Sequence, residues 1–394
     1  MSQDRNKPPK AEGRAIVADR VFDGRGWHRG AAVMIQGGRI AGLASRGEVP
    51  SDWQQSRVPA GVFVTAGFID VQVNGGGGVL LNDRPTIDSM RAIARAHRRF
   101  GTTACLPTLI TDTREQMRSA IAAARSLAGR DGVLGLHLEG PFISPQRPGV
   151  HRSDRIVQPG AGDLELLCEL SGAGHSLVTL APECVPPGFV MTLAAAGVRA
   201  SIGHSEASAA VVAQAVAEGA TGVTHLFNAM PPFSARAPGI VGTALSEPRL
   251  TAGIIVDGIH VDPVSVRAAF AAKGADRIAL VTDAMPTVGA ALDHFDLVGR
   301  TIKLIDGRLT TQEGTLAGAH LDMASAVRNA VGLAKVPLED ALRAASLTPA
   351  QFLGVENERG AIVPGARADL VALTDKLIVA ATWIDGEIES YGVP

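Results

Sequence analysis

The sequence predicts an α/β protein: a (β/α)8 TIM-like barrel with a small β-sandwich domain built from both chain ends. Eight short apolar runs alternate, mainly with Ala-rich segments of helix length, through the middle of the chain, and eight βα units close such a barrel. Both chain ends are instead rich in β-forming residues. The structural alternative is a doubly wound open sheet. Against it, no glycine-rich dinucleotide fingerprint opens a helix, and NGGGG at 74–78 lacks the required spacing.

The chain ends are predicted to pair with each other. Their β-rich runs, broken by glycine turns, are residues 15–24, 31–44, 61–70, 308–314 and 368–388. The polar stretch from Gly354 to Arg367 marks the return of the chain to this domain. We therefore expect residues 1–66 and 354–394 to form the sandwich. Residues 67–353 are expected to form the barrel, with a β excursion near 296–312.

The barrel strands are expected at the eight apolar runs of the middle region. These runs are residues 67–75, 102–111, 132–141, 176–183, 198–205, 222–231, 250–260 and 277–286. The clearest helical segments between them are residues 86–100, 114–129 and 207–219. Side chains alternate along a strand, so Gly135, His137 and Glu139 should face the barrel interior while the intervening leucines pack on the helices.

Composition excludes several classes of function. The 394 residues carry 37 basic and 39 acidic side chains, a formal net charge of −2, whereas nucleic-acid binding needs a basic excess. No apolar run approaches the roughly 18 to 20 residues that span a bilayer, and the polar start of the chain lacks a signal core. The three cysteines are too few for a disulfide framework or a CxxC metal site. We expect a cytoplasmic protein that binds neither membrane nor nucleic acid.

Four side chains that carry chemistry stand at the carboxyl ends of predicted strands, where barrel enzymes place their active sites. They are Glu139, His204, His225 and Asp283. One carboxylate, two imidazoles and a water can hold a catalytic divalent metal, and an aspartate can then act as general base. Each residue also has a structural interpretation: hydrogen-bonded histidines, an ion-paired glutamate, and an aspartate that caps a helix. Their recurrence at four strand ends favours the metal site.

The first barrel strand carries amides where many metal-dependent hydrolases of this architecture carry a His-x-His pair. Asp70, Gln72 and Asn74 project on one face of that strand. Amides are poor zinc ligands compared with imidazole, so a second metal position should be empty or weakly held. The alternative is that Gln72 and Asn74 only form hydrogen bonds within the barrel mouth.

The motifs around these residues, taken in order, resemble the N-acetylglucosamine-6-phosphate deacetylase family of the amidohydrolase superfamily. They are AGFIDVQVNGGGG, LHLEGPFISP, IGHSEAS, THLFNAMPP, GIIVDGIHVDP, VTDAMP and TLAGAHLDM. The resemblance runs from about Ala11 to the C-terminus, and HLEGPF and THLFNAMP are its distinctive parts. It implies metal-dependent hydrolysis of N-acetyl-D-glucosamine 6-phosphate to D-glucosamine 6-phosphate and acetate, in amino-sugar catabolism and cell-wall sugar recycling.

The resemblance also implies roles for individual residues. Glu139, His204 and His225 match the metal ligands, and Asp283 matches the catalytic acid/base. His151 matches a histidine that contacts the acetyl carbonyl oxygen, where it would stabilise a developing oxyanion. The positions that match substrate contacts are Val150, His151, Asn228, Ala229, Arg236, His260, Leu316, Ala317 and Gly318.

Within the substrate set, Arg236 and His260 match phosphate contacts, and a guanidinium can grip a phosphate bidentately. In relatives the arginine can come from a second subunit, which implies a homodimer. The Gln72-x-Asn74 pair resembles the single-metal members of the family, so we expect one divalent ion per subunit. Zinc is the expected ion, and the same ligands accommodate Fe2+, Co2+ or Mn2+.

Several alternatives stay open at this point. His320 and Asp322 stand where many relatives carry small or hydroxylated residues, which leaves the exact sugar open, and N-acetylgalactosamine 6-phosphate or another phosphorylated amino sugar is the closest rival substrate. A non-catalytic amidohydrolase-like scaffold is a rival of another class, although such proteins typically lose metal ligands. A cyclic-amide hydrolase would usually need a His-x-His pair and a strand-end lysine; the sequence lacks the pair and has no such lysine between Glu139 and His204. No role is assigned to His97, His137 or His294.

Overall fold

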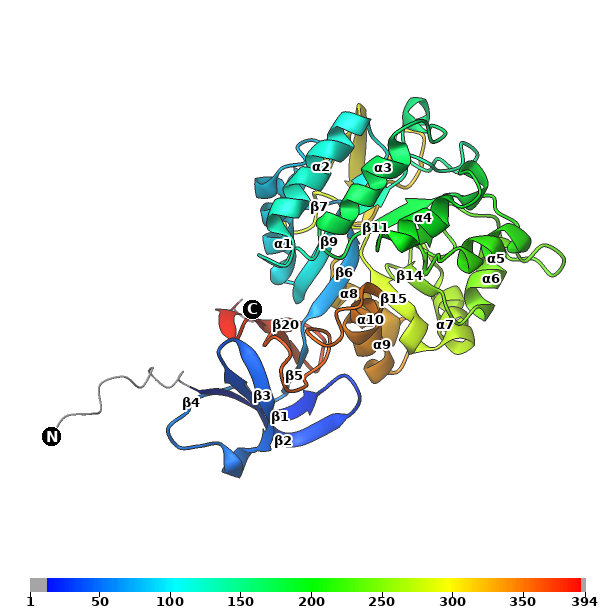
Figure 1. The fold of residues 1–394 in the computed structure, drawn as a ribbon. Helices are drawn as coiled ribbons and strands as arrows, with labels where there is room; N and C mark the ends of the chain where they lie inside the picture. Colours follow the sequence, from blue (N-terminus) through cyan, green and yellow to red (C-terminus); the bar gives the residue numbers. More distant parts are fainter. Residues whose placement is uncertain (1–12, 391–394) are drawn as a thin grey trace.

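The structure, a computed structural model, describes residues 13–390 of the chain. Two large sheets organise it: a ring of parallel strands enclosed by helices, and a separate sheet built from the two chain ends. In Figure 1 the ring occupies the upper part, and the blue N-terminal strands lie beside the orange and red C-terminal segment below it. Residues 1–12 and 391–394, which belong to the predicted sandwich, lie outside the described residues. None of the helices in the described part combines the length and apolar character needed to cross a membrane.

The eight expected barrel strands are all present and lie in chain order in one parallel sheet. They are β6 (Phe68–Val73), β9 (Thr102–Ile110), β10 (His137–Glu139), β11 (Leu177–Leu180), β12 (Arg199–Ile202), β13 (Gly222–Val223), β14 (Thr251–Ile255) and β15 (Ile278–Val281). The first and last strands meet just beyond β15, where the Asp283 N–H donates to the Gln72 carbonyl over 3.0 Å and the Gly75 N–H donates to the Ala284 carbonyl over 2.9 Å. These bonds close the barrel, so the carboxyl ends of all eight strands open onto one face.

A helix follows each barrel strand, and two further helices end the barrel region. The helices are α1 (Ile87–Arg98), α2 (Arg114–Leu127), α3 (Asp163–Cys168), α4 (Phe189–Ala195), α5 (Ala209–Ala217), α6 (Gly239–Ser246), α7 (Pro263–Lys273), α8 (Met323–Gly332), α9 (Leu338–Ala345) and α10 (Leu347–Leu353). The predicted segments 86–100, 114–129 and 207–219 are α1, α2 and α5. Their N-cap residues Thr86, Thr113 and Ser208 each accept a backbone N–H from the first turn, which fixes where these helices start.

The sheet from the chain ends joins strands that lie more than 300 residues apart in sequence. Its strands are β1 (Arg14–Phe22), β2 (Trp27–Gln36), β3 (Arg39–Ser45), β4 (Gln54–Arg57), β5 (Val62–Ala66), β19 (Leu370–Thr374), β20 (Val379–Ile384) and β21 (Glu387–Ser390). N-terminal β5 pairs with C-terminal β19 in the centre. The Ile40 N–H donates to Ala366 O and the Ala368 N–H to Gly38 O, so the sheet closes over its own apolar core.

Strand β5 ends at Ala66 in the end sheet, and β6 begins at Phe68 in the barrel. At the other side of the barrel region, α10 ends at Leu353, before the return towards β19. We propose that the domains divide at these two points, as the sequence predicts.

Short elements decorate the barrel mouth and the loops. A three-stranded antiparallel sheet is inserted between β15 and α8, close to the excursion expected near 296–312, and the run 308–314 contributes to it and not to the end sheet. The remaining strands are β7 (Gly75–Gly76), β8 (Val79–Leu80), β16 (His294–Leu297), β17 (Arg300–Ile305) and β18 (Arg308–Thr310). The 3-10 turns are η1 (Arg46–Glu48), η2 (Ser153–Arg155), η3 (Glu169–Gly172), η4 (Pro182–Cys184) and η5 (Ala275–Arg277).

A chain of polar side chains crosses the barrel interior below the strand ends. His137 Nε2 lies 2.7 Å from Thr179 Oγ1, which lies 2.6 Å from Thr224 Oγ1, which in turn lies 2.7 Å from Ser201 Oγ. All four residues are buried, so these bonds satisfy polar groups that would otherwise be costly inside the barrel. His137 therefore faces inward as the strand alternation predicts, while Leu136 and Leu138 are buried in the main apolar core.

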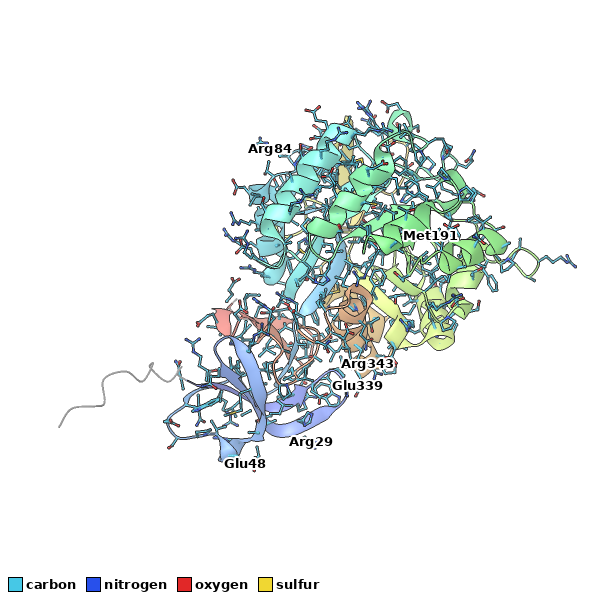
Figure 2. All side chains as sticks on the ribbon, in the orientation of Figure 1. Arg29, Glu48, Arg84, Met191, Glu339 and Arg343 are labelled. Atoms are coloured by element: carbon cyan, nitrogen blue, oxygen red, sulfur yellow. The ribbon has the colours of Figure 1, made fainter. Side chains whose placement is uncertain are left out.

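The barrel and the end sheet meet at α9. The indole Nε1 of Trp27 donates to Glu339 Oε1 over 2.7 Å, and Trp27 also packs against Phe22 and Phe63. Figure 2 shows Glu339 and Arg343 where the barrel meets the end sheet, whereas Arg29 and Glu48 lie on the far side of that sheet. This contact lies at the amino ends of the barrel strands, opposite the face onto which their carboxyl ends open.

Candidate metal centre

Side chains from three strand ends converge at the carboxyl face of the barrel. Glu139 is the last residue of β10, and His204 and His225 follow the ends of β12 and β13. Glu139 Oε1 lies 2.9 Å from His225 Nε2 and 3.2 Å from His204 Nε2, and the two Nε2 atoms lie 3.0 Å apart. The fold thus brings Glu139 into contact with His204 and His225, which lie 65 and 86 residues further along the chain.

The backbone aims these side chains by adopting an uncommon conformation. His204, His225 and Asp283 have positive φ values of 49°, 33° and 50°, a region that side chains other than glycine rarely adopt. Each residue leaves its strand at this point and turns its side chain into the barrel mouth. Such a conformation costs on the order of 1–3 kcal/mol per residue, and such strain clusters at functional sites.

The donor set fits a divalent cation. His204 Nδ1 lies 2.8 Å from the Arg147 carbonyl oxygen, which can only accept, so Nδ1 carries a proton and Nε2 is the ring nitrogen available to a cation. For His225, no described residue accepts from the buried Nδ1. A carboxylate and two imidazole nitrogens around one point are the ligands of catalytic zinc sites. These residues therefore indicate a divalent metal centre.

Charges inside the site are strongly coupled. Burial disfavours ionised Glu139, yet hydrogen bonds and charge from His204 and His225 outweigh burial and hold the pKa of Glu139 well below its usual range. Burial likewise opposes a charged His225, but the bond and charge of Glu139 raise the pKa of this histidine. The pocket thus stabilises an anionic carboxylate facing positive charge, which is the arrangement that a bound cation requires.

Asp283 lies beside this centre and is held by the two amides of the first strand. Gln72 Nε2 lies 3.2 Å from both carboxylate oxygens of Glu139 and 3.2 Å from Asp283 Oδ1, and Asn74 Nδ2 also donates to Asp283 Oδ1. The amide N–H groups thus separate two carboxylates. Burial, followed by the charge of Glu139, raises the pKa of Asp283 to about 6, which suits a group that takes and returns protons near neutrality.

The alternative role of Asp283 as a helix cap is wrong, because the chain after it enters the inserted sheet. Asp322 is the N-cap of α8 instead, and it accepts from the Ser325 N–H over 2.8 Å.

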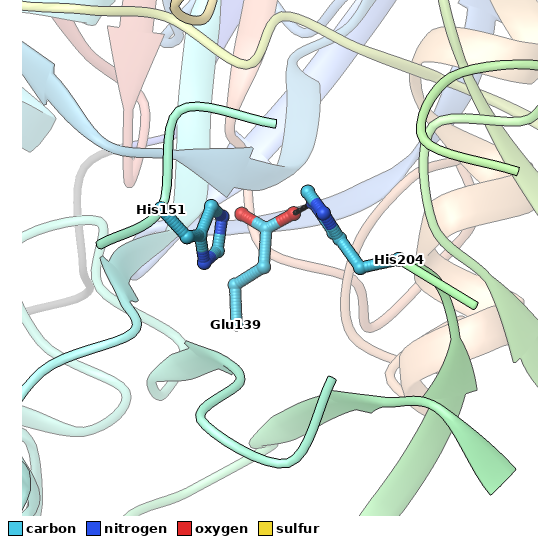
Figure 3. A group of neighbouring side chains, drawn as sticks. All are labelled: Glu139, His151 and His204. Atoms are coloured by element: carbon cyan, nitrogen blue, oxygen red, sulfur yellow. Dashed lines mark hydrogen bonds and ion pairs between the residues drawn. The ribbon is translucent and has the colours of Figure 1, made fainter. Parts of the chain in front are cut away.

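His151 completes the cluster from the loop after β10. Figure 3 shows the Glu139 carboxylate between the rings of His151 and His204. Donor atoms of these three buried residues lie within 4.8 Å of one another, so the structure offers His151 as well as His225 as a partner of Glu139 and His204. Burial, then the charge of His204, lowers the pKa of His151 to about 3, so this ring is neutral. Its Nδ1 lies 2.7 Å from the Thr111 hydroxyl oxygen, which also lies 3.2 Å from the Glu139 carbonyl oxygen. When this hydroxyl donates to Nδ1, Nε2 carries the ring proton and can donate to a substrate.

The cluster forms part of the lining of an open cavity of about 530 Å3. The predicted site residues that line it are Glu139, Val150, His151, His204, His225, Asn228, Ala229, His260, Asp283, Leu316 and Gly318. Among the described residues, the lining includes neither Ala317, which is fully buried beside the inserted sheet, nor Arg236. Arg236 is exposed on the 231–238 segment of the loop between β13 and α6.

The remaining histidines lie away from the cavity lining. His97 is buried and its Nε2 lies 2.9 Å from the Gly75 carbonyl, a contact that supports the glycine-rich turn after β6. His294 is exposed and pairs with Asp293. His320 is exposed and its Nδ1 lies 2.9 Å from Thr287 Oγ1.

Sequence reasoning missed several residues of the site. Arg147 contributes a backbone carbonyl to His204, and a backbone contact leaves no side-chain signal in a sequence. Thr111 is the last residue of the predicted strand 102–111, so reading every strand end for hydroxyls as well as for charges would have found it. Ile110, Ile255 and Met285 form apolar parts of the cavity wall, where their residue types do not distinguish them from the core.

The chain is similar to known proteins along most of its length. The model of the amidohydrolase family matches residues 63–388. The chain is 41% identical over 362 residues to an N-acetylgalactosamine-6-phosphate deacetylase from Shewanella sp. (strain ANA-3), covering 91% of each protein. It is 35% identical over 361 residues to an N-acetylglucosamine-6-phosphate deacetylase from Haemophilus influenzae, covering 90% of this chain and 94% of that one. The crystal structure of N-acetylglucosamine-6-phosphate deacetylase from Pasteurella multocida superposes with a TM-score of 0.92 at 35% identity, covering 96% of this chain and 100% of that one.

Proposed function

The chain belongs to the amidohydrolase family, and we propose that it hydrolyses N-acetyl-D-glucosamine 6-phosphate to D-glucosamine 6-phosphate and acetate. The observation that carries this proposal is the convergence of Glu139, His204, His225 and Asp283 in one cavity. The names of relatives that are 35–41% identical support the amide of a phosphorylated amino sugar as the target. The reaction belongs to amino-sugar catabolism and cell-wall sugar recycling, and we place it in the cytoplasm.

One divalent cation per subunit is held by Glu139, His204 and His225 in this proposal, with zinc as the first choice and Fe2+, Co2+ or Mn2+ as alternatives. When bound, the cation supplies Lewis acidity towards water and towards the acetyl carbonyl oxygen. Gln72 and Asn74 direct their amide nitrogens at carboxylates, and this arrangement supports a single cation per subunit.

The residues of the chain move the protons. Asp283 accepts the proton of the attacking water and then delivers it to the amine nitrogen, so that the C–N bond breaks and a neutral amine leaves. His151 donates from Nε2 to the acetyl carbonyl oxygen as negative charge develops there, while the Thr111 hydroxyl holds its Nδ1. His151 is buried and Asp283 is half-buried, so bulk water competes little with these interactions.

Binding of the sugar phosphate at a distance from the amide orients the reacting group. His260, Asn228 and Ala229 line the cavity and are proposed to hold the phosphate and sugar, together with Val150 and the loop of Leu316, Ala317 and Gly318. Arg236 lies outside the cavity lining of its own chain, which supports its use in the site of a second subunit. We therefore propose a homodimer.

N-acetyl-D-galactosamine 6-phosphate is the second candidate substrate. It is favoured by the 41% identity to a relative named for that sugar, against 35% to the Haemophilus influenzae relative named for the glucosamine sugar. The two sugars differ in the orientation of one hydroxyl group, so the catalytic groups would act identically on both.

An assay of acetate release from both sugar phosphates, with the metal content of the protein measured in parallel, tests the proposal. We expect turnover of N-acetyl-D-glucosamine 6-phosphate with about one metal ion per subunit, and a higher kcat/KM than for the galactosamine epimer. A reversed preference would assign the second candidate. Bound metal without acetate release from either sugar would favour the non-catalytic scaffold.

A further inference from the structure

We propose that Asp257 is a positioning residue that orients His260, so that an imidazolium held between the Asp257 carboxylate and the substrate phosphate donates from Nε2 to a phosphate oxygen. The inference rests on the proposed function, because it takes His260 as a phosphate contact. It adds a residue that does not line the cavity itself: the described lining includes His260 but not Asp257.

Asp257 is bonded to His260 at both its backbone and its ring. The segment after β14 turns so that Asp257 Oδ1 accepts the backbone N–H groups of Ile259 and His260, each over 2.8 Å. Asp257 Oδ2 lies 2.6 Å from His260 Nδ1. The side chains are only 8% and 7% exposed, so solvent competes little for this pair. One carboxylate therefore fixes the loop and the imidazole together.

The chemistry of imidazole explains how the contact between Asp257 and His260 can affect phosphate binding. A carboxylate can only accept, so His260 Nδ1 carries a proton and donates it to Asp257. With Nδ1 protonated, Nε2 can donate to a phosphate oxygen only as part of an imidazolium. The negative charge of Asp257 stabilises that cation from one side, and the phosphate stabilises it from the other. Charge-assisted hydrogen bonds are roughly twice as strong as neutral ones.

The isosteric variant Asp257→Asn separates this role from a structural one. Its carboxamide oxygen can still accept the two backbone N–H groups, so the loop is retained. Its NH2 group would face His260 Nδ1, which reverses the proton on the ring and leaves a neutral imidazole with an Nε2–H. The phosphate contact then survives as a neutral hydrogen bond, without the charge.

The same loop supplies a matched control. Asp262 is the N-cap of α7, where its carboxylate accepts the Val264 N–H over 2.8 Å, and Asp262 is exposed. Asp262→Asn therefore removes one negative charge close to His260 without touching the imidazole.

Calorimetric binding of D-glucose 6-phosphate to the zinc-loaded protein is the first test, since this probe carries the phosphate and has no amide to hydrolyse. We expect Asp257→Asn to raise Kd about tenfold, and Asp262→Asn to leave Kd within twofold of the parent. In a His260→Asn background, Asp257→Asn should have no further effect, because it acts through that ring. Unchanged binding by Asp257→Asn, or an equal loss in the His260→Asn background, would overturn the proposal.

Kinetics supply the second test and separate this inference from the proposed function. On N-acetyl-D-glucosamine 6-phosphate, Asp257→Asn should raise KM about tenfold with kcat little changed, and kcat/KM for unphosphorylated N-acetyl-D-glucosamine should be unchanged. An equal loss on both sugars would show a merely structural role. A parent protein that binds the probe but releases no acetate would refute the proposed function, and the binding series would still decide the role of Asp257.

Discussion

The residues of the proposed metal centre have backbone conformations and surroundings that by themselves lower the stability of the fold. His204, His225 and Asp283 each take a positive φ at a strand end, and Glu139 is a carboxylate that is 2% exposed. Strained backbone and buried charge are both destabilising unless partners compensate them. The compensation comes from the other members of the same cluster, so the residues depend on one another and on the cation that their donor atoms fit.

Replacing Asp283 by Asn should lower kcat by about a hundredfold or more, because general acid–base catalysis typically contributes that much. The amide cannot take the proton of water, but it can still accept from Asn74 and Gln72, so the fold and the metal content should be retained. Acetate release and metal analysis on the same sample check both parts. Near-normal turnover would refute the role assigned to Asp283.

His225 and His151 both approach Glu139 and His204, and a pair of variants assigns their roles. We expect His225→Asn to lose most of the bound metal, whereas His151→Asn should keep its metal and lose turnover by about tenfold or more. Metal analysis of the purified proteins distinguishes them, with the exposed His294→Gln as control. Metal loss in His151→Asn and not in His225→Asn would exchange the two roles.

At the scale of elements, the seam between the first and last barrel strands lies directly below Asp283. Asp70 in β6 is fully buried and accepts from the hydroxyl and the backbone N–H of Thr282, which follows β15, and from the Gln72 N–H. The seam thus fixes the residues on either side of Asp283. Secondary structure alone does not do this, because β6 and β15 are distant in sequence.

The Asp70 carboxyl makes stability depend on pH. Burial, partly offset by the bonds from Thr282 and Gln72, raises the pKa of Asp70 from 3.8 to about 7. The folded state therefore binds a proton that the unfolded state has lost, and this group's contribution to stability falls as pH rises from about 4 to 7. The Asp70→Asn variant has no titrating group at this position, so its stability should not show this decrease with pH.

The free energy of unfolding of Asp70→Asn, taken relative to that of the parent protein, should increase by about 2 kcal/mol from pH 5.5 to pH 8. One pKa unit corresponds to about 1.4 kcal/mol. Urea unfolding at both pH values measures the difference, and any constant cost of the amide cancels. The same difference between variant and parent at both pH values would contradict this account.

The elements themselves could be predicted from local patterns. Each of the eight apolar runs contains a barrel strand, and the sequence predicted them because alternation and flanking glycines are local signals. The run 308–314 was less informative: its strand β18 joins the inserted sheet with β16 and β17, since the choice of pairing partner depends on the distant chain.

On the scale of the whole molecule, a buried ion pair stabilises the return of the chain to the end sheet. Asp369, whose side chain is 3% exposed, pairs with Arg359, and its backbone carbonyl accepts the Gly67 N–H between β5 and β6. Removing one partner leaves the other charge buried, which typically costs about 3–5 kcal/mol. The pair therefore contributes to the junction between the end sheet and the barrel.

Asp369→Ala should accordingly lower the free energy of unfolding by about 3–5 kcal/mol. Asp19→Ala, which breaks an ion pair whose side chains are more than half exposed, should cost less than about 1 kcal/mol. Thermal or urea unfolding of the two variants makes the comparison. Similar losses in both would mean that the buried pair has no special role.

The proposed dimer predicts complementation between two impaired proteins. Arg236→Ala should lack the phosphate contact and Asp283→Asn the catalytic group. If Arg236 acts across the dimer, mixed dimers contain one site with both residues intact, so exchanging subunits should restore acetate release. If the rate of acetate release by the mixture stays at the average of the two variants, Arg236 does not act in the partner's site.

The sequence by itself determined the barrel, the pairing of the chain ends, and the strand-end positions of Glu139, His204, His225 and Asp283, because these follow from local periodicity and from distinctive motifs. The tertiary structure decided what surrounds them: Gln72 between two carboxylates, Thr111 on His151, Asp257 on His260, and Arg236 outside the cavity lining. Apart from Asp257, these arrangements join or separate residues that are remote in sequence. They depend on how strands and loops pack, and a one-dimensional pattern does not record that packing.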